Sequence, residues 1–517
     1  MRVDKRRTPR SSRLHRRDET RRRQRIAGAL ALLVLLVAAC GGGQTARQEL
    51  VAVEQFPGGA VADEPRAVLV AQDILAEGGN AADAAVGLYF ALAVTYPGAA
   101  GLGGGGACVV FDRGKKLTES LVFFPRAPAS GGDIAVPANA RGMAALHARY
   151  GRLHWGKVLA PAEKLARFGV PLSRAYVKSL EAVGSGVLSD RRLWRLAVGA
   201  DGRLRREGET VRQPELADTL AALRLRSGGT LATGALAQSL VAGMRTAGVS
   251  LTPDDMRRTA PTWRQTLRFD AWDLTLHTVP KPASGELVID LWRRLANGDR
   301  YRKAPPSERP AMFAEAASRV YGVAGVPTKG PVGDDSSTGF VVVDRTGSAV
   351  ACTVTMNRPF GARRMAGGTG ILLAAALPSG TGERAFLTPL LVVNRPVVAL
   401  RKEPNQLFLA ATATGGAPAP ASLAGVVYSL LTEDRPLGEA LAAPRVFAGP
   451  PSAPILYEAT LGRESAAVLE RRGGRPAGPR GLGRINAVYC ADGLPNDPQS
   501  CRFGSDPRGY GMSVGND

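Results

Sequence analysis

Histidine is scarce in this chain, whose 517 residues include only His15, His147, His154 and His277. A Ser-His-Asp hydrolase needs an imidazole that is hydrogen-bonded to its nucleophile. None of the four histidines lies near the hydroxyl-rich segment at residues 333–373, which holds the strongest candidates for catalysis. The scarcity argues against a Ser-His-Asp site there.

Other signatures are missing as well. The sequence contains no cluster of metal-ligand residues and no internal repeat, so we expect neither a metal centre nor a repeat array. The glycine-rich loop Gly101–Gly106 lacks the Lys-Ser/Thr pair of a P-loop and precedes a predicted strand. A nucleotide site is therefore a weak interpretation of that loop, and no cofactor is expected.

Acidic residues are outnumbered: 45 Asp and Glu stand against 67 Lys and Arg, for a formal net charge of +22. Residues 2–25 hold twelve basic and three acidic residues, and so supply nine of these charges. Nucleic-acid binding is one interpretation of so basic a chain. The basic run directly precedes an apolar stretch, however, so we assign it to an export signal and expect no nucleic-acid partner.

Residues 1–39 are predicted to be an export signal peptide. A fourteen-residue apolar run, Ile26–Ala39, follows the basic arm and is too short to span a membrane as a mature helix. The sequence Val37-Ala38-Ala39-Cys40 resembles a bacterial lipobox, which predicts lipidation at Cys40 and a lipid anchor in the cell envelope, facing the periplasm. An uncleaved or ordinarily cleaved signal with an incidental cysteine is the alternative, and the latter would give a plain periplasmic protein.

The chain has five cysteines. Cys490 and Cys501 bracket a short Gly/Pro/Asn loop, a spacing that a disulfide can close, and disulfides suit an exported protein. Cys108 and Cys352 lie in predicted core strands, and we expect them to be buried thiols.

The segment 333–373 predicts a β-hairpin with hydroxyl groups at its entry. Ser336–Thr338 lead into an apolar run, Phe340–Val343, and a turn at Asp344–Gly347 connects it to a second strand at Ala349–Thr355. A hydroxyl at the first residue of a core strand suits an N-terminal nucleophile hydrolase, in which cleavage of the preceding bond frees an α-amine that serves as the base. On the hairpin alone, an ordinary Ser/Thr-rich turn is the simpler interpretation.

Helices are predicted upstream. Apolar residues at helical spacing indicate helices at Val68–Leu75 and Ala81–Val94. Gly78-Gly79 end the first, and Asn80 is the expected N-cap of the second.

The hairpin segment resembles the nucleophile region of the gamma-glutamyltransferases (glutathione hydrolases). The residues that match this family without a gap are Asp344, Gly347, Ala349, Val350, Thr353, Thr355, Asn357, Phe360, Gly361 and Gly370–Leu373. Further blocks resemble the family in family order, at residues 62–110, 150–173, 252–256, 280–286, 413–418, 438–447 and 485–511. The resemblance therefore covers nearly all of the chain after the signal.

This resemblance implies an α+β fold, a four-layer αββα sandwich of the N-terminal nucleophile hydrolase type. It also implies self-cleavage between Ser336 and Ser337. The large half would then be residues 40–336 and the small half residues 337–517, and the two would stay together as a heterodimer. With 45% apolar residues, the chain is long enough for a sizeable core.

The residues onto which the family's catalytic roles fall are Ser337, Thr355 and Asn357, and those for substrate and oxyanion contacts are Thr338, Gly415 and Gly416. Ser337 would be the nucleophile that forms a covalent acyl-enzyme. Thr355 would hydrogen-bond its amine or hydroxyl, and Asn357 would orient it. The backbone N–H groups of the two glycines could form an oxyanion hole.

The positions that bind the substrate's amino-acid head group in the family differ here, and they are Phe124, Ala376, Ser379, Ala385 and Phe386. Phe124 stands at the place of an arginine that holds the α-carboxylate, and Ser379 at that of an aspartate that holds the α-amine. Each charge-assisted contact is worth roughly 1.5–3 kcal/mol. Their loss predicts weaker binding of a γ-glutamyl group and a more apolar pocket, unless Arg126 or Arg141 substitutes.

Three functions remain open. The first is a gamma-glutamyltransferase that acts on glutathione-like amides. The second is an amidohydrolase of the same fold for a less charged acyl group. The third is a catalytically inactive envelope protein that binds or scaffolds. The retained Thr355, Asn357 and glycine pair favour an enzyme, whose partner would be a small amide substrate.

Overall fold

A computed structural model describes residues 56–515, except 227–230, 232, 328–331, 334–335, 378–384, 396–404 and 479–480. The predicted export signal, Cys40 and Ser379 lie outside the described residues. Within the described part of the chain, no helix is both long enough and apolar enough to cross a membrane.

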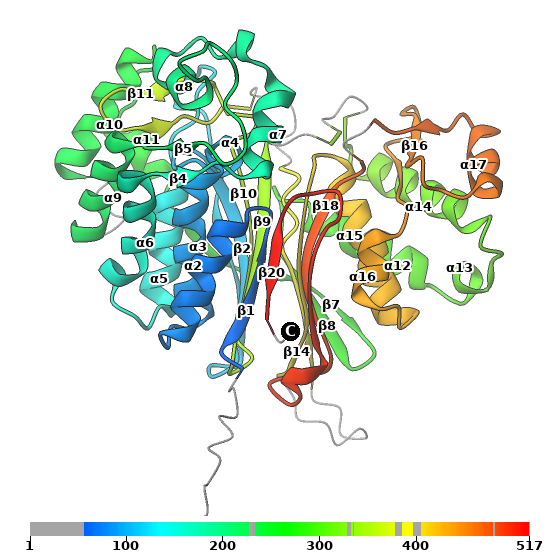
Figure 1. Cartoon of the computed structure of the whole chain (residues 1–517). Coiled ribbons are helices and arrows are strands. Elements are labelled where there is room, and N and C mark those ends of the chain that lie inside the picture. The colour runs from blue at the N-terminus through cyan, green and yellow to red at the C-terminus, as the bar shows by residue number, and fades with distance from the viewer. Residues whose placement is uncertain are drawn as a thin grey trace, which may run out of the picture. The chain divides into compact units, whose positions relative to one another are not determined.

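Two antiparallel sheets pack face to face (Figure 1). The first contains, in order across the sheet, β20 (Met512–Val514), β1 (Gly58–Ala62), β9 (Ser337–Asp344), β10 (Ala349–Thr355), β2 (Gly105–Asp112), β3 (Leu117–Phe123) and β6 (Thr262–Gln265). The second contains β19 (Cys501–Ser505), β18 (Arg484–Leu494), β14 (Leu407–Thr414), β13 (Leu390–Asn394), β8 (Leu274–Thr278) and β7 (Leu267–Ala271).

Helices cover the outer face of each sheet (Figure 1). On the side of the first sheet lie α2 (Pro65–Ala76), α3 (Ala81–Thr95), α4 (Pro97–Ala100), α5 (Asn139–Tyr150), α6 (Trp155–Phe168), α7 (Arg174–Val183), α8 (Arg191–Ala197), α9 (Pro214–Arg226), α10 (Gly234–Thr246) and α11 (Pro253–Arg258). On the side of the second lie α12 (Gly285–Ala296), α13 (Arg300–Lys303), α14 (Arg309–Val323), α15 (Pro418–Thr432), α16 (Leu437–Ala442) and α17 (Arg463–Glu470). The expected α+β, four-layer αββα architecture is confirmed.

Short strands complete the structure: β4 (Val170–Pro171), β5 (Thr210–Val211), β11 (Met365–Ala366), β12 (Ile371–Leu372), β15 (Val446–Ala448), β16 (Ile455–Tyr457) and β17 (Arg475–Pro476).

Strand β9 shows how the layers divide the apolar residues. All eight of its residues are buried. Phe340 and Val342 pack into the cluster under the first helix layer, whereas Val341 and Val343 pack into the cluster between the sheets. A strand that is covered on both faces needs a continuous apolar run instead of an alternating one, which is the pattern that predicted it.

Helix α3 is buried along its whole length, at all fifteen residues. Asn80 caps it in a capping box: its side chain accepts from the N–H of Asp83, whose carboxylate accepts from the N–H of Asn80. The helix also docks on the hairpin turn, because the N–H of Ala81 donates to Oδ2 of Asp344 at 3.0 Å. The two predicted helices and the predicted cap are confirmed, with ends that shift by a few residues.

The expectation for Cys108 and Cys352 is wrong. These residues form a disulfide across neighbouring strands β2 and β10, where they face each other in register with their Cα atoms 4.1 Å apart. They are separated by 244 residues in sequence, so the strand pairing that brings them together is not visible locally. Cys490 and Cys501 form a second disulfide, between β18 and the start of β19.

Candidate active site

Ser337 is the first residue of β9 and lies opposite Thr355, the last residue of β10. Both residues are buried, with 5% of their surface exposed. Because alternate residues of a strand face opposite sides, Ser337 shares its side with Val341 and Val343, which pack between the sheets. The end of the hairpin therefore directs both hydroxyl-bearing side chains toward the space between the two sheets.

The peptide carbonyl that precedes Ser337 is held by two donors. The hydroxyl of Thr355 donates to the carbonyl oxygen of Ser336 at 3.0 Å, and the N–H of Met356 donates to the same oxygen at 2.8 Å. Bonded and non-bonded pairs alternate along an antiparallel ladder, so the bonded pair Ser336–Met356 makes Ser337–Thr355 a non-hydrogen-bonded pair. The N–H of Ser337 thus points away from β10, while the preceding carbonyl is polarised.

Asn357 follows β10 in the left-handed region, with φ of 62°, which asparagine tolerates better than most residues. Its N–H donates to Oγ1 of Thr355 at 2.8 Å, which leaves the Thr355 hydroxyl proton free to face Ser336. Its side-chain amide donates to the carbonyl oxygen of Ala375 at 2.8 Å and to that of Pro125 at 3.4 Å. Asn357 therefore orients Thr355 through its backbone.

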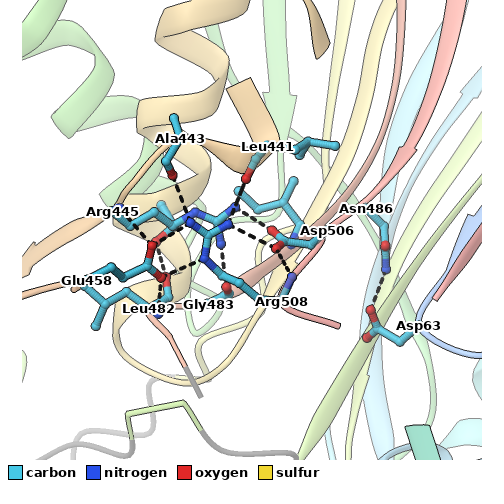
Figure 2. A network of polar contacts seen from close by, with 12 residues as sticks. Asp63, Leu441, Ala443, Arg445, Glu458, Leu482, Gly483, Asn486, Asp506 and Arg508 are labelled. Atoms are coloured by element: carbon cyan, nitrogen blue, oxygen red, sulfur yellow. Dashed lines mark hydrogen bonds and ion pairs between the residues drawn. The ribbon is translucent and has the colours of Figure 1, made fainter. Parts of the chain in front are cut away.

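Thr338 is fully buried, and its hydroxyl donates to Oδ2 of Asp63 at 2.8 Å. Asn486 of β18 donates from its side-chain amide to Oδ1 of Asp63 at 2.9 Å and to the carbonyl oxygen of Gly339 at 2.8 Å (Figure 2 shows the Asp63–Asn486 contact). The side chain of Thr338 thus helps to join the two sheets next to Ser337. Sequence reasoning missed Asp63 and Asn486, although both lie in blocks that match the family.

The glycine pair lies at the end of β14, with φ of 110° at Gly415 and 77° at Gly416. Val332 and Gly333, a few residues before Ser337, pack against this pair. The N–H of Gly333 donates to the carbonyl oxygen of Gly415 at 3.0 Å, and Val332 forms a β-bridge with Gly416. The structure therefore brings the glycine pair and the chain that leads to Ser337 together.

Near the end of β10, apolar residues occupy positions at which the gamma-glutamyltransferases have charged or polar residues. Gly105, the partner of Thr355 in β2, packs its backbone against Phe123 and Pro125, which border Phe124. Phe124 and Ala376 are buried. Ala376 follows Ala375, whose carbonyl accepts the amide of Asn357.

Of the other predicted pocket residues, Ala385 packs against the cluster between the sheets that includes Phe124, and Phe386 packs against the cluster under the second helix layer. Ala385 and Phe386 are half-buried, and the N–H of Ala385 donates to the carbonyl oxygen of Pro282 at 3.0 Å. Of the two proposed substitutes, Arg126 is exposed, and Arg141 donates to the carbonyl oxygen of Met256. Burial lowers the pKa of Arg141.

Solved structures with the same fold include the crystal structure of cephalosporin acylase from Bacillus halodurans, at a TM-score of 0.74 and 21% identity. The match covers 89% of this chain and 96% of that one. At this identity, the likeness establishes the fold alone.

Curated relatives include the glutathione hydrolase proenzyme of Escherichia coli (strain K12), which is 27% identical over 59% of this chain and 64% of its own length. The glutathione hydrolase proenzyme of Pseudomonas aeruginosa is 29% identical over 61% of this chain and 67% of its own. The alignment thus spans less than two-thirds of the E. coli relative.

The family model described as gamma-glutamyltranspeptidase matches residues 67–327 and 326–515. These two ranges hold most of the chain, including the whole hairpin with Ser337 and Thr355, and the chain belongs to the gamma-glutamyltranspeptidase family.

Proposed function

We propose that this protein cleaves itself between Ser336 and Ser337 and then hydrolyses or transfers acyl groups through Ser337. The observation that carries the proposal is the pair of hydrogen bonds from Thr355 and Met356 to the carbonyl oxygen of Ser336. These donors lie where negative charge develops when the neighbouring hydroxyl attacks the carbonyl carbon, and fixed donors at such a place lower the barrier.

The self-cleavage takes two steps. The hydroxyl oxygen of Ser337 bonds to the carbonyl carbon of Ser336, the C–N bond breaks, and the hydroxyl proton ends on the departing nitrogen. This leaves an ester and a free α-amine on Ser337. Water then cleaves the ester, which gives a carboxylate on Ser336 and restores the Ser337 hydroxyl. The halves 40–336 and 337–517 remain associated, because β9 and β10 of the smaller half pair with β1 and β2 of the larger half, respectively.

In the cleaved enzyme, the α-amine of Ser337 is the base that takes the hydroxyl proton when Ser337 attacks a substrate amide. The N–H groups of Gly415 and Gly416 are the proposed oxyanion donors. In the uncleaved chain, Val332 and Gly333 pack on this glycine pair. Cleavage after Ser336 gives that segment a free end, so that it can leave the glycine pair and admit an acyl group.

The substrate class is an acyl amide. The relatives named glutathione hydrolase support a γ-glutamyl amide as the general type. A less charged acyl group is the second candidate, and the buried Phe124 and Ala376 near the end of β10 favour it. The shared fold of a protein named cephalosporin acylase is compatible with this second candidate.

The proposed location is the bacterial cell envelope. The basic arm, the apolar run and the lipobox-like Cys40 support export with a lipid anchor at that cysteine. Simple release into the periplasm is the second candidate.

Intact-mass measurement of the purified protein after reduction of its disulfides tests self-cleavage. We expect two polypeptides, the smaller one beginning at Ser337, and a single uncut polypeptide for Ser337→Ala. A wild-type chain that stays whole after prolonged incubation would rule out both catalytic candidates and leave the inactive binding protein.

A further inference from the structure

The glycine pair rests on a second stretch of backbone, residues 482–485. A Cβ placed on Gly415 would lie 2.9 Å from the Cα of Gly483, so the two backbones touch. Gly483 itself has φ of 97°, and a Cβ there would lie 3.2 Å from the carbonyl oxygen of Thr414. Arg484 then pairs with Thr414 in the ladder between β18 and β14. The position of the glycine pair therefore depends on where this supporting segment lies.

Side chains bind the backbone of the supporting segment from several directions. The carbonyl oxygen of Gly483 accepts from Arg445, and the N–H of Ile485 donates to Asp506 at 2.9 Å. The N–H of Leu482 donates to Glu458 at 3.0 Å, and its carbonyl oxygen accepts from the hydroxyl of Ser422. Consecutive backbone groups are thus fixed by groups outside the segment.

Three of these side chains belong to one buried charge cluster, made of Arg445, Glu458, Asp506 and Arg508 (Figure 2). Arg445 binds Asp506, and Arg508 binds both Glu458, at 2.5 Å, and Asp506, at 3.2 Å. Arg508 also donates to the carbonyl oxygens of Leu441, at 2.8 Å, and Ala443, at 2.9 Å. The cluster is therefore anchored at the end of α16.

The cluster holds two positive and two negative groups, so its net charge is zero. Burial pushes the pKa of Glu458 upward, but the bonds from Arg508 and from backbone N–H groups outweigh burial and bring the pKa below its usual value. Replacing a buried ion pair by apolar residues is often neutral for stability. Stability alone is thus a weak reason for four charges here, whereas fixing the geometry of the supporting segment is a specific one.

We propose that the charge cluster is a positioning device for the proposed oxyanion donors: Arg445, Asp506 and Glu458 fix residues 482–485, and this segment sets the position of Gly415 and Gly416. The inference rests on the proposed function, since it concerns the N–H groups that would act on a substrate amide. None of the cluster residues contacts the substrate in this scheme. They act through the backbone of the supporting segment.

Two variants test the inference on the full-length, processed protein. Ser422→Ala removes only the bond to the carbonyl of Leu482. Arg445→Lys keeps the charge but cannot bind both Gly483 and Asp506 with a planar fork. The matched control is Arg309→Lys, whose half-buried pair with Glu433 lies in the same helix layer but does not contact the supporting segment. Initial rates on an acyl anilide give kcat and KM, and thermal unfolding gives Tm.

We expect kcat to fall by about tenfold or more in Arg445→Lys and by a smaller factor in Ser422→Ala, because misplaced oxyanion donors act on the transition state. KM should change by less than about threefold, and Tm should fall no further than in the control. A lower Tm with unchanged kcat per folded molecule would assign the cluster to stability alone and overturn the inference. A wild type that neither cleaves itself nor turns over any acyl anilide would overturn the proposed function, and this inference with it.

Discussion

The hydroxyl of Thr355 donates a 3.0 Å hydrogen bond to the carbonyl oxygen of Ser336, the carbonyl of the peptide bond that would be cut. Thr355 therefore donates to the carbonyl group that Ser337 is proposed to attack. The adjacent N–H of Met356 serves the same oxygen. This relationship leads to a prediction about the rate of self-cleavage.

Thr355→Val should slow self-cleavage by roughly a hundredfold, the typical effect of losing one oxyanion donor. The side chain keeps its shape, and the N–H of Met356 remains as the second donor. The measurement is the fraction of cut chain against time by denaturing gel electrophoresis with reductant. Thr355→Ser restores the hydroxyl and should cleave at close to the wild-type rate. Equal rates for the valine and wild-type proteins would show that this bond does not assist cleavage.

Substrate preference should follow the apolar residues beside β10. We expect weak hydrolysis of γ-glutamyl anilides and faster hydrolysis of an acyl anilide that lacks the α-amine or α-carboxylate, because no arginine stands at Phe124 to bind a carboxylate. Phe124→Arg combined with Ser379→Asp should shift the ratio of the two kcat/KM values toward the γ-glutamyl substrate. Efficient, saturable cleavage of glutathione by the wild type would contradict this prediction.

Protonation of His277 should make the folded protein less stable in acid. This residue of β8 is bonded to Oγ1 of Thr266 at 2.8 Å. Burial lowers its pKa from 6.5 to about 4, with a further lowering by Arg268 and an opposing effect of Asp270. The unfolded chain takes up the proton first on acidification. The contribution of His277 to the free energy of unfolding is therefore fully present above about pH 6.5 and is lost as the pH falls toward 4.

His277→Gln tests this contribution. At pH 4.5, about two units below the pKa of an ordinary histidine, the wild type should have lost roughly 2–3 kcal/mol of its free energy of unfolding, since one pKa unit corresponds to roughly 1.4 kcal/mol. Urea unfolding at pH 7.5 and pH 4.5 should show a smaller difference between the two pH values in the variant than in the wild type. The same difference in both proteins would place the acid sensitivity elsewhere.

If Cys40 carries the proposed lipid, Cys40→Ser should abolish fatty-acid incorporation and release the protein from the membrane fraction without changing its fold. Metabolic labelling with a fatty acid, followed by fractionation, measures both effects. Failure of the wild type to incorporate label would favour simple periplasmic export.

The sequence was sufficient to predict helices α2 and α3 and the hairpin of β9 and β10, because those signals are local. The apolar run after Ser337, the turn before Ala349 and the cap at Asn80 each span a few residues. What could not be predicted depends on distant pairings. Asp63 meets Thr338 across 275 residues and Asn486 across 423. The charge cluster joins residues from three places after α16, namely Arg445, Glu458 and the pair Asp506 and Arg508, and each of these charges is indistinguishable in sequence from an ordinary surface charge.

If the chain is cut after Ser336, the disulfide between Cys108 and Cys352 becomes a covalent link between two polypeptides, because each polypeptide then holds one of its sulfurs. Cleavage would create two chains but not two separable molecules. A denaturing gel without reductant should show one band at full mass, and reductant should resolve two. Cys490–Cys501 lies wholly within the smaller polypeptide and cannot produce this behaviour. Separate bands without reductant in Cys352→Ser would identify the 108–352 bond as the tether that keeps a processed envelope enzyme from losing its nucleophile-bearing chain.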